Sequence, residues 1–258
     1  MTGLGPELRT RVGKLARVGH LLVALDFDGT LAPFTDVPDE ARALPASARA
    51  IDVLAALTDT DVALISGREL ASLRRVAAPG EHTLLVGSHG AERWAPEEFD
   101  AEATQAELTK TQRKVLAATQ AALEAVAERF DGLWVEPKPA GAVLHTRLAA
   151  GQGEQATQAA LRALAKVKGA HVREGKDVIE ASVLGADKGQ GLIWLREVSD
   201  AAVVLFVGDD RTDEDAFAVL RKQDVGIKVG PGPTQAEFRV DGPGDVADLL
   251  QLLADVRE

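Results

Sequence analysis

The 258-residue sequence contains no cysteine. Disulfide bonds, thiolate nucleophiles and cysteine-ligated zinc are therefore excluded, and a reducing cytoplasm is the location we expect. Residues 1–20, "MTGLGPELRTRVGKLARVGH", carry scattered charges and lack a continuous apolar stretch. Because a membrane span needs roughly 20 apolar residues, we expect neither a signal peptide nor a membrane anchor in this segment.

Basic residues are in the minority: 29 Lys and Arg stand against 40 Asp and Glu, which gives a formal net charge of −11. This charge argues against a general nucleic-acid-binding or anionic-membrane surface, so we expect neither partner. If the ligand is anionic, its attraction must come from a local site. Hydrophobic residues make up 46% of the chain and charged residues 27%, which is typical of a soluble globular protein.

Short apolar runs alternate with helical patterns in the first third of the chain. The runs "LLVALDF", "VALISG" and "TLLVGSHG" are apolar without alternation. Between the first two lies "ASARAIDVLAALTD", in which Ala48, Ile51, Leu54 and Ala55 share one helical face. Continuous apolar strands separated by helices are typical of a parallel sheet that is buried on both faces. The pattern resumes with a helix from Gly189, the strand "AVVLFVGDD", a helix through "EDAFAVLRKQ" at 214–223, the strand "VGIKV" and a last helix, "DVADLLQLLADV".

The segment between these halves follows another pattern. A long helical stretch, from about Ala101 to Phe130, precedes "LWVEPKPAGAVLHTRLA", which predicts a hairpin around Pro139–Gly141. A second helix, "EQATQAALRALAKV", precedes a second predicted hairpin, "AHVREGKDVIEASV". Helix-strand-strand repeated twice forms a small α+β unit. We therefore predict a discontinuous core domain, residues 1–96 and 183–258, with an inserted α+β cap domain, residues 97–182.

Polar residues end three of the predicted core strands: Asp26 and Asp28, then Ser66, then Asp209 and Asp210. Because open parallel sheets bind ligands at the carboxyl ends of their strands, we expect these side chains to converge. Carboxylates held together without a cation would raise each other's pKa and cost stability, whereas a hard divalent cation makes the cluster favourable. Oxygen ligands at this density favour Mg²⁺ over zinc.

A carboxylate pair at such a metal site suits the hydrolysis of a phosphate monoester. One carboxylate can attack phosphorus while the metal offsets its charge against that of the phosphate. The second carboxylate, two residues on, can protonate the leaving oxygen and later deprotonate the water that hydrolyses the aspartyl-phosphate. Gly29 permits the sharp turn that holds the pair, and the Thr30 hydroxyl can tie it down.

Four segments resemble, in order, the motifs of the haloacid dehalogenase (HAD)-like phosphatase superfamily. They are "DFDGTL" at 26–31, "SGR" at 66–68, "DKG" at 187–189 and "GDDRTDEDAF" at 208–217. The insert between the second and third motifs stands at the superfamily's C2 cap position, and the resemblance spans nearly the whole chain. It implies an α/β fold with a Rossmann-like parallel-sheet HAD core and a C2-type α+β cap.

The resemblance also implies a role for individual residues. Asp26 is expected to be the nucleophile, Asp28 the acid/base, Ser66 a donor to the phosphate and Lys188 the cation that neutralises it. The implied metal residues are Asp26, Asp28 through its backbone carbonyl, Asp209, and Asp213 indirectly or through water. Mg²⁺ is the one cofactor that we expect.

Three further segments are similar to those of trehalose-6-phosphate phosphatases: "VGSHGAE" at 86–92, "VEPKPAGAVLHTR" at 135–147 and "GKDVIEASVLGADKG" at 175–189. The similarity implies hydrolysis of trehalose 6-phosphate to trehalose and phosphate. It also implies a functional link to a separate trehalose-6-phosphate synthase, since no glycosyltransferase domain fits in this chain. We expect a monomer. The implied substrate-binding residues are Gly67, Arg68, His89, Glu92, Glu136, Lys138, His145, Arg147, Lys176 and Glu180.

The chemistry of these side chains agrees with a sugar ligand, because charged groups strengthen hydrogen bonds to hydroxyls. At a period of two, Glu136 and Lys138 share one face of a strand, as do His145 and Arg147. An antiparallel sheet with a solvated polar face would show the same pattern.

Three alternative functions remain open. The first is a phosphatase for another sugar phosphate, such as sucrose phosphate, a glucosylglycerol-type phosphate or a hexose phosphate. The second is a catalytically silent regulator that binds a sugar phosphate, and the third is a phosphomutase.

Overall fold

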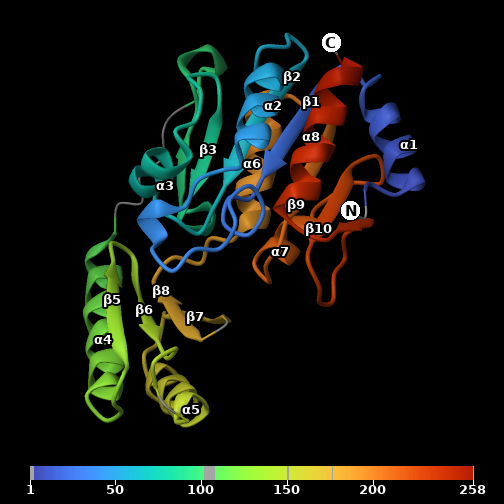
Figure 1. The fold of residues 1–258 in the computed structure, drawn as a ribbon. Coiled ribbons are helices and arrows are strands. Elements are labelled where there is room, and N and C mark those ends of the chain that lie inside the picture. Colours follow the sequence, from blue (N-terminus) through green and yellow to red (C-terminus); the bar gives the residue numbers. More distant parts are fainter. Residues whose placement is uncertain (1–2, 102–107, 150, 176, 258) are drawn as a thin grey trace. The chain divides into compact units, whose positions relative to one another are not determined.

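The computed structural model describes residues 3–101, 108–149, 151–175 and 177–257, and the chain divides into two compact units (Figure 1). We name residues 1–105 with 186–258 the core unit, and residues 106–185 the cap unit. The division expected from the sequence lies at 96/97 and 182/183. Each unit has its own sheet and its own hydrophobic core.

The core unit alternates helices and strands along the chain. Its strands are β1 (Leu21–Leu25), β2 (Thr60–Ile65), β3 (Leu84–Gly87), β4 (Glu92–Trp94), β9 (Val203–Gly208), β10 (Val225–Val229) and β11 (Phe238–Val240). Its α-helices are α1 (Pro6–Leu15), α2 (Pro45–Ala55), α3 (Leu70–Ala77), α6 (Lys188–Ser199), α7 (Asp213–Phe217) and α8 (Pro243–Arg257), and the 3-10 helices are η1 (Pro38–Glu40), η2 (Ser88–Gly90) and η3 (Glu97–Phe99).

The core strands form one sheet in the order β11-β10-β9-β1-β2-β3-β4, parallel except for the β3–β4 pair. Alternate residues of β1 face opposite sides, so Leu21, Val23 and Leu25 pack with α1, α2, α3 and α8, whereas Leu22 and Ala24 pack with α6 and α7. The sheet is therefore buried on both faces, which explains the continuous apolar runs in the sequence.

The cap unit pairs its four described strands in the antiparallel order β5-β6-β8-β7: β5 (Trp134–Lys138), β6 (Gly141–His145), β7 (His171–Gly175) and β8 (Val178–Ser182). Its helices, α4 (Lys110–Ala127) and α5 (Gly153–Leu164), pack on one face of this sheet. Leu144 and Ile179 point to that face, against Leu123 and Leu164. The opposite face carries the polar residues of the two hairpins.

The predicted α/β class is confirmed, with a mostly parallel sheet and a separate antiparallel one. Two predicted helices differ in extent. The one expected from about Ala101 begins as α4 at Lys110, where Thr109 and Gln112 form a capping box. The one expected over 214–223 ends at Phe217. Among the described helices, none is long and apolar enough to cross a membrane.

Candidate active site

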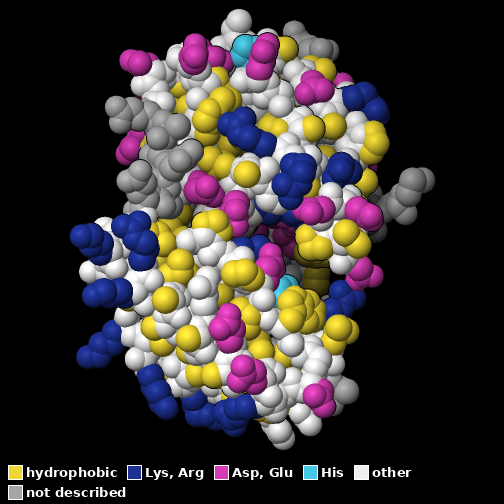
Figure 2. Space-filling view, turned by 90° about the vertical axis from the view of Figure 1, so that its left-hand side faces the viewer, with side chains coloured by type: hydrophobic (Ala, Val, Ile, Leu, Met, Phe, Trp, Pro, Cys, Tyr) yellow, Lys and Arg dark blue, Asp and Glu magenta, His cyan; other side chains and the backbone are white. Residues whose placement is uncertain are grey.

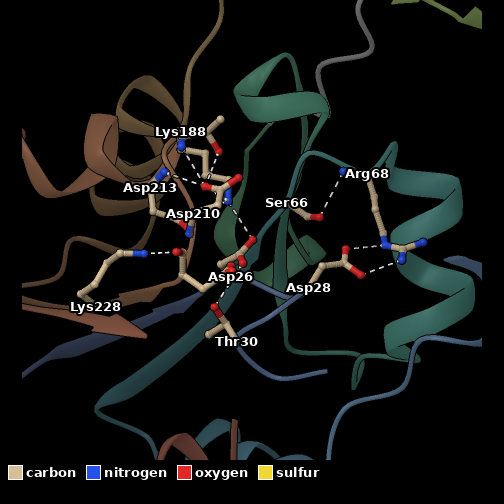
Figure 3. A network of polar contacts seen from close by, with 11 residues as sticks. Asp26, Asp28, Thr30, Ser66, Arg68, Lys188, Asp210, Asp213 and Lys228 are labelled. Carbon is tan, nitrogen blue, oxygen red and sulfur yellow. Dashed lines mark hydrogen bonds and ion pairs between the residues drawn. The ribbon is translucent and has the colours of Figure 1, made fainter. Parts of the chain in front are cut away.

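Asp26 immediately follows β1 and is held from three sides. Its backbone N–H donates to Val207 O of the neighbouring strand at 2.9 Å. Of its carboxylate oxygens, Oδ2 accepts from the Thr30 hydroxyl at 3.2 Å and Oδ1 accepts from Lys188 Nζ at 2.7 Å (Figure 3). The residue is only 4% exposed. Burial raises the pKa of Asp26 to about 8, although the Lys188 ammonium acts in the opposite direction.

Lys188 is the first residue of α6, and its ammonium group joins the end of β1 to the start of α7. It donates to Asp26 Oδ1 and to Asp213 Oδ1, both at 2.7 Å. Burial alone would lower the pKa of this ammonium, but the charges of Asp213 and Asp26 outweigh burial and raise it above its usual value. Lys188 therefore remains a cation in the interior, beside the carboxylate expected to attack phosphorus.

Asp209 completes a compact acidic cluster with Asp26 and Asp213. One oxygen from each of the three carboxylates lies within 4.8 Å of the others. Burial, together with the charges of Asp210 and Asp213, raises the pKa of Asp209 to about 6. The Oδ1 atom of Asp209 is buried and has no hydrogen-bond partner among the described residues. An orphaned carboxylate oxygen inside an oxygen-only cluster fits a hard divalent cation.

Asp28 points away from this cluster. Its carboxylate accepts two hydrogen bonds from Arg68, from Nε to Oδ2 at 2.6 Å and from Nη2 to Oδ1 at 2.7 Å (Figure 3). Ser66, which follows β2, lies beside this pair and accepts from the Arg68 backbone N–H at 3.1 Å. The structure therefore brings Asp26, Asp28 and Ser66 to one edge of the sheet, with Arg68 committed to Asp28.

His89 lies in η2 and Glu92 begins β4, in a tightly packed part of the core unit. Glu92 Oε2 accepts from the Ser88 hydroxyl at 2.6 Å and from the Leu70 N–H, at the start of α3, at 3.1 Å. A Cβ atom added to Gly67 would lie 2.5 Å from His89 Cε1, so the imidazole needs a glycine at that position. Glu92, expected to bind substrate, thus holds the N-terminus of a helix in this structure.

Lys228 was not among the predicted site residues, and Asp210 had no predicted role. Lys228 is 4% exposed, although it carries a charge in the buried strand β10. Its Nζ donates to the backbone carbonyl oxygens of Asp209 and Val229, the latter at 3.2 Å. Asp210 Oδ1 accepts from the backbone N–H of Asp213 at 3.0 Å. A lysine within the apolar run "VGIKV" is the signal that could have identified Lys228.

The cap unit presents a polar network on the sheet face opposite its helices. Glu136 binds Lys138 and also His145, whose Nε2 lies 3.0 Å from Glu136 Oε2. Burial raises the pKa of Glu136, but hydrogen bonds from Lys138 and His145 outweigh it and lower the pKa. The imidazole of His145 stacks on the indole of Trp134, with ring centroids 4.4 Å apart.

Of the two other described cap residues predicted to bind substrate, only Glu180 lies on the same sheet face as Glu136. Glu180 pairs with Val143 in register, and Val143 pairs with Glu136, so both glutamates face the same side of the sheet. Arg147 is exposed and lies two residues beyond the end of β6, so strand alternation does not extend to it. Lys176 lies outside the described residues.

Comparisons with known proteins agree with this geometry. The trehalose-phosphatase family model matches residues 24–243. The trehalose-phosphate phosphatase of Mycobacterium avium (strain 104) is 37% identical over 254 residues, which are 93% of this chain and 63% of the relative. That of Mycobacterium leprae (strain TN) is 33% identical over 251 residues, which are 90% and 57% of the two chains. The chain thus spans about 60% of the length of these two curated relatives.

Two solved structures show the same fold. The C-terminal domain of the Candida albicans trehalose-6-phosphate phosphatase has a TM-score of 0.81 and 24% identity, over 98% of this chain and 97% of that one. The Aspergillus fumigatus trehalose-6-phosphate phosphatase, crystal form 3, has a TM-score of 0.68 and 25% identity, over 98% of each chain.

Proposed function

The chain belongs to the trehalose-phosphatase family, and we propose that it is a Mg²⁺-dependent phosphatase that hydrolyses trehalose 6-phosphate to trehalose and phosphate. One observation carries the proposal: Lys188 binds the Asp26 and Asp213 carboxylates at 2.7 Å, with Asp209 in the same cluster. Retaining a buried cluster of repelling carboxylates is costly unless a cation and a reaction use it.

In the proposed reaction, a carboxylate oxygen of Asp26 attacks phosphorus as the bond to the sugar oxygen breaks. Asp28 gives a proton to that sugar oxygen, and trehalose leaves. Asp28 then takes a proton from a water molecule, which attacks the aspartyl-phosphate and releases phosphate. Lys188 offsets the negative charge of the phosphoryl group, and the Ser66 hydroxyl donates a hydrogen bond to it.

Mg²⁺, held by Asp26, Asp209 and the Asp28 backbone carbonyl, with Asp213 acting indirectly, would neutralise charge on the phosphate in the transition state. Lys228 supports this arrangement, because its ammonium holds the backbone carbonyl of Asp209. Arg68 holds the Asp28 carboxylate in a bidentate pair, so we infer that Asp28 must turn out of this pair to reach the leaving oxygen.

The cap unit supplies the groups that we assign to the sugar. Glu136, Lys138, His145 and Glu180 gather on one sheet face, where carboxylate, ammonium and imidazole groups can bind several hydroxyls.

An acidic protein can still bind a phosphate dianion, because the attraction is local. Figure 2 shows acidic and basic side chains together on one face of the molecule.

We further propose that the protein acts in the cytoplasm as a monomer, on sugar phosphate made by a separate synthase. The absence of cysteine is compatible with a reducing compartment. Size-exclusion chromatography with light scattering tests the monomer, since a dimer would double the 27.2 kDa mass.

The test of the activity is phosphate release from trehalose 6-phosphate, sucrose 6-phosphate and glucose 6-phosphate, each with Mg²⁺ or EDTA. The variant Asp26→Asn removes the nucleophile, and Asp248→Asn, an exposed position on α8, is the matched control. We expect Mg²⁺-dependent preference for trehalose 6-phosphate that only Asp26→Asn abolishes. Preference for another sugar phosphate would overturn the substrate, and inactivity on all three would overturn the reaction.

A further inference from the structure

Phe34 is an aromatic residue that the proposed mechanism does not use. Phe34 is 79% exposed, more than any other large hydrophobic residue in the described part of the chain. We name Asp28, Gly29 and Thr30 the catalytic turn. Phe34 follows this turn in the same loop. Single exposed hydrophobic residues are common on protein surfaces, so the significance of Phe34 lies in its position next to Gly29 and Asp209.

The backbone that carries Phe34 is firmly anchored. Asp28 and Ala32 form a bridge, and the Gly29 N–H donates to Ala32 O at 2.8 Å. Ala32 is fully buried, whereas Pro33 and Phe34 are exposed. Because proline restricts the backbone directly before Phe34, the ring is carried by a rigid turn. Its exposure is therefore built into the turn.

The ring tip reaches back to the catalytic turn. Gly29 has a φ of +80°, and a Cβ atom added there would lie 2.3 Å from Asp209 Oδ2 and 2.7 Å from Phe34 Cζ. The Phe34 ring edge and the Asp209 carboxylate thus approach the same side of Gly29, where a side chain would stand. An aromatic edge is electropositive, so this orientation next to a carboxylate is favourable. With the tip at Gly29 and the residue 79% exposed, the ring faces remain open to solvent.

We propose that Phe34 is a stacking platform for the sugar ring of the substrate, a specificity-determining contact on the core unit. The inference rests on the proposed function, because it requires a phosphorylated cyclic sugar in the site. The ester oxygen of the substrate lies next to Asp26 and Asp28 during reaction, and the attached ring then lies within reach of the turn that carries Phe34. The C–H face of a sugar ring is apolar and flat enough to cover a phenyl face.

The test compares kcat/KM for trehalose 6-phosphate with kcat/KM for glycerol 3-phosphate, a linear ester without a ring. Removing a contact that buries about 55 Å² of apolar surface lowers binding about tenfold. We therefore expect Phe34→Ala to lower the ratio of the two values about tenfold, through KM of the sugar phosphate. Phe34→Tyr, which keeps the flat ring, should restore the ratio, and Val37→Ala, an exposed apolar residue of the same loop, should leave it at the wild-type value.

The outcomes separate this inference from the proposed function. Equal losses of kcat/KM on both esters in Phe34→Ala would mean that the ring acts on the metal cluster. Wild-type kcat/KM on both esters would mean that the ring contacts no substrate. Either result overturns the platform while trehalose 6-phosphate remains the substrate. If the wild-type protein hydrolyses another cyclic sugar phosphate, the ratio is measured with that ester. Wild-type activity confined to linear esters would overturn both proposals.

Discussion

Replacing Asp209 by Asn should make the metal-free protein more stable and abolish its stabilisation by Mg²⁺. Asp209 belongs to the cluster with Asp26 and Asp213, and its Oδ1 atom has no hydrogen-bond partner in the described chain. Without a metal ion, burial and the charges of Asp210 and Asp213 outweigh the attraction of the Lys188 ammonium for this carboxylate. Asparagine keeps the shape of the side chain and removes that charge.

The magnitude follows from the pKa of Asp209. Raising the pKa from 3.8 to about 6 makes ionisation of this carboxyl in the folded state about 3 kcal/mol less favourable. Because the folded pKa is the higher one, the neutral carboxyl favours folding below pH ~4, and this contribution is lost as the pH rises through 6. At pH 7.5 the full cost is present, so Asp209→Asn in EDTA should gain about 3 kcal/mol, or 6–12 °C in Tm.

Urea unfolding monitored by circular dichroism, in EDTA and in Mg²⁺, measures both effects. The wild-type protein should lose stability between about pH 4 and 6 in EDTA, and it should gain stability when Mg²⁺ is added at pH 7.5. Asp209→Asn should flatten that part of the pH profile and gain nothing from Mg²⁺. Asp248→Asn, at an exposed position, should behave as wild type. A destabilised Asp209→Asn in EDTA, or one that Mg²⁺ still stabilises, would refute the reasoning.

Three other substitutions probe the remaining parts of the site. Lys188→Met should lower the free energy of unfolding by about 3–5 kcal/mol, because two buried carboxylates lose their cation; wild-type stability in urea would contradict this. Arg68→Gln should lower kcat for trehalose 6-phosphate roughly ten- to a hundredfold, because Arg68 no longer holds Asp28 at the edge of the sheet from which it turns to the leaving oxygen. Steady-state kinetics should show a smaller loss for p-nitrophenyl phosphate, whose leaving group needs no proton; equal losses would exclude this role. Glu180→Gln should raise KM for trehalose 6-phosphate about tenfold and spare p-nitrophenyl phosphate, and a parallel loss on both would remove Glu180 from the sugar site.

The core could be predicted from the sequence because its physical basis is local. A strand buried on both faces must be apolar throughout, so β1, β2 and β9 are visible as runs. The convergence of Asp26 and Asp209 follows from the same topology, since β1 and β9 are parallel neighbours. The proximity of Asp26 and Asp209 was therefore predictable from strand order, whereas the Asp28 carboxylate, expected to converge with them, pairs with Arg68; the roles of all these residues stay predictions.

The partners of the charged side chains could not be predicted in the same way. Arg68 was expected to bind substrate, and in the structure it forms a bidentate pair with Asp28, which lies 40 residues earlier in the chain. Glu92 was expected to bind sugar and caps the N-terminus of α3. Such choices depend on which backbone groups and charges lie nearby in three dimensions, and no periodicity records them.

The early end of α7 has the same kind of cause. The apolar pattern continues past Phe217, but the N–H of Arg221 donates to Asp224 Oδ2, and the Asp224 carboxylate is also held by Arg196 of α6. The carboxylate therefore captures a backbone N–H that a longer helix would have used. A tertiary ion pair here overrides a local helical preference.

The charges of the described cluster lead to a further conclusion about the metal. Asp26, Asp209 and Asp213 carry three negative charges when ionised, and Lys188 returns one positive charge through its bonds to two of them. The ammonium of Lys228 binds backbone carbonyls, so it neutralises none of the three carboxylates directly. Asp210, whose Oδ1 lies 3.9 Å from Lys188 Nζ, adds a fourth carboxylate, so three negative charges remain and the proposed Mg²⁺ would balance two of them. A phosphate dianion that enters before such a cation would meet a strongly negative site, whereas one that enters after it would meet a less negative site with an ammonium group directed at it. We therefore expect the binding of the metal and of the phosphate to be coupled, each strengthening the other by the same factor.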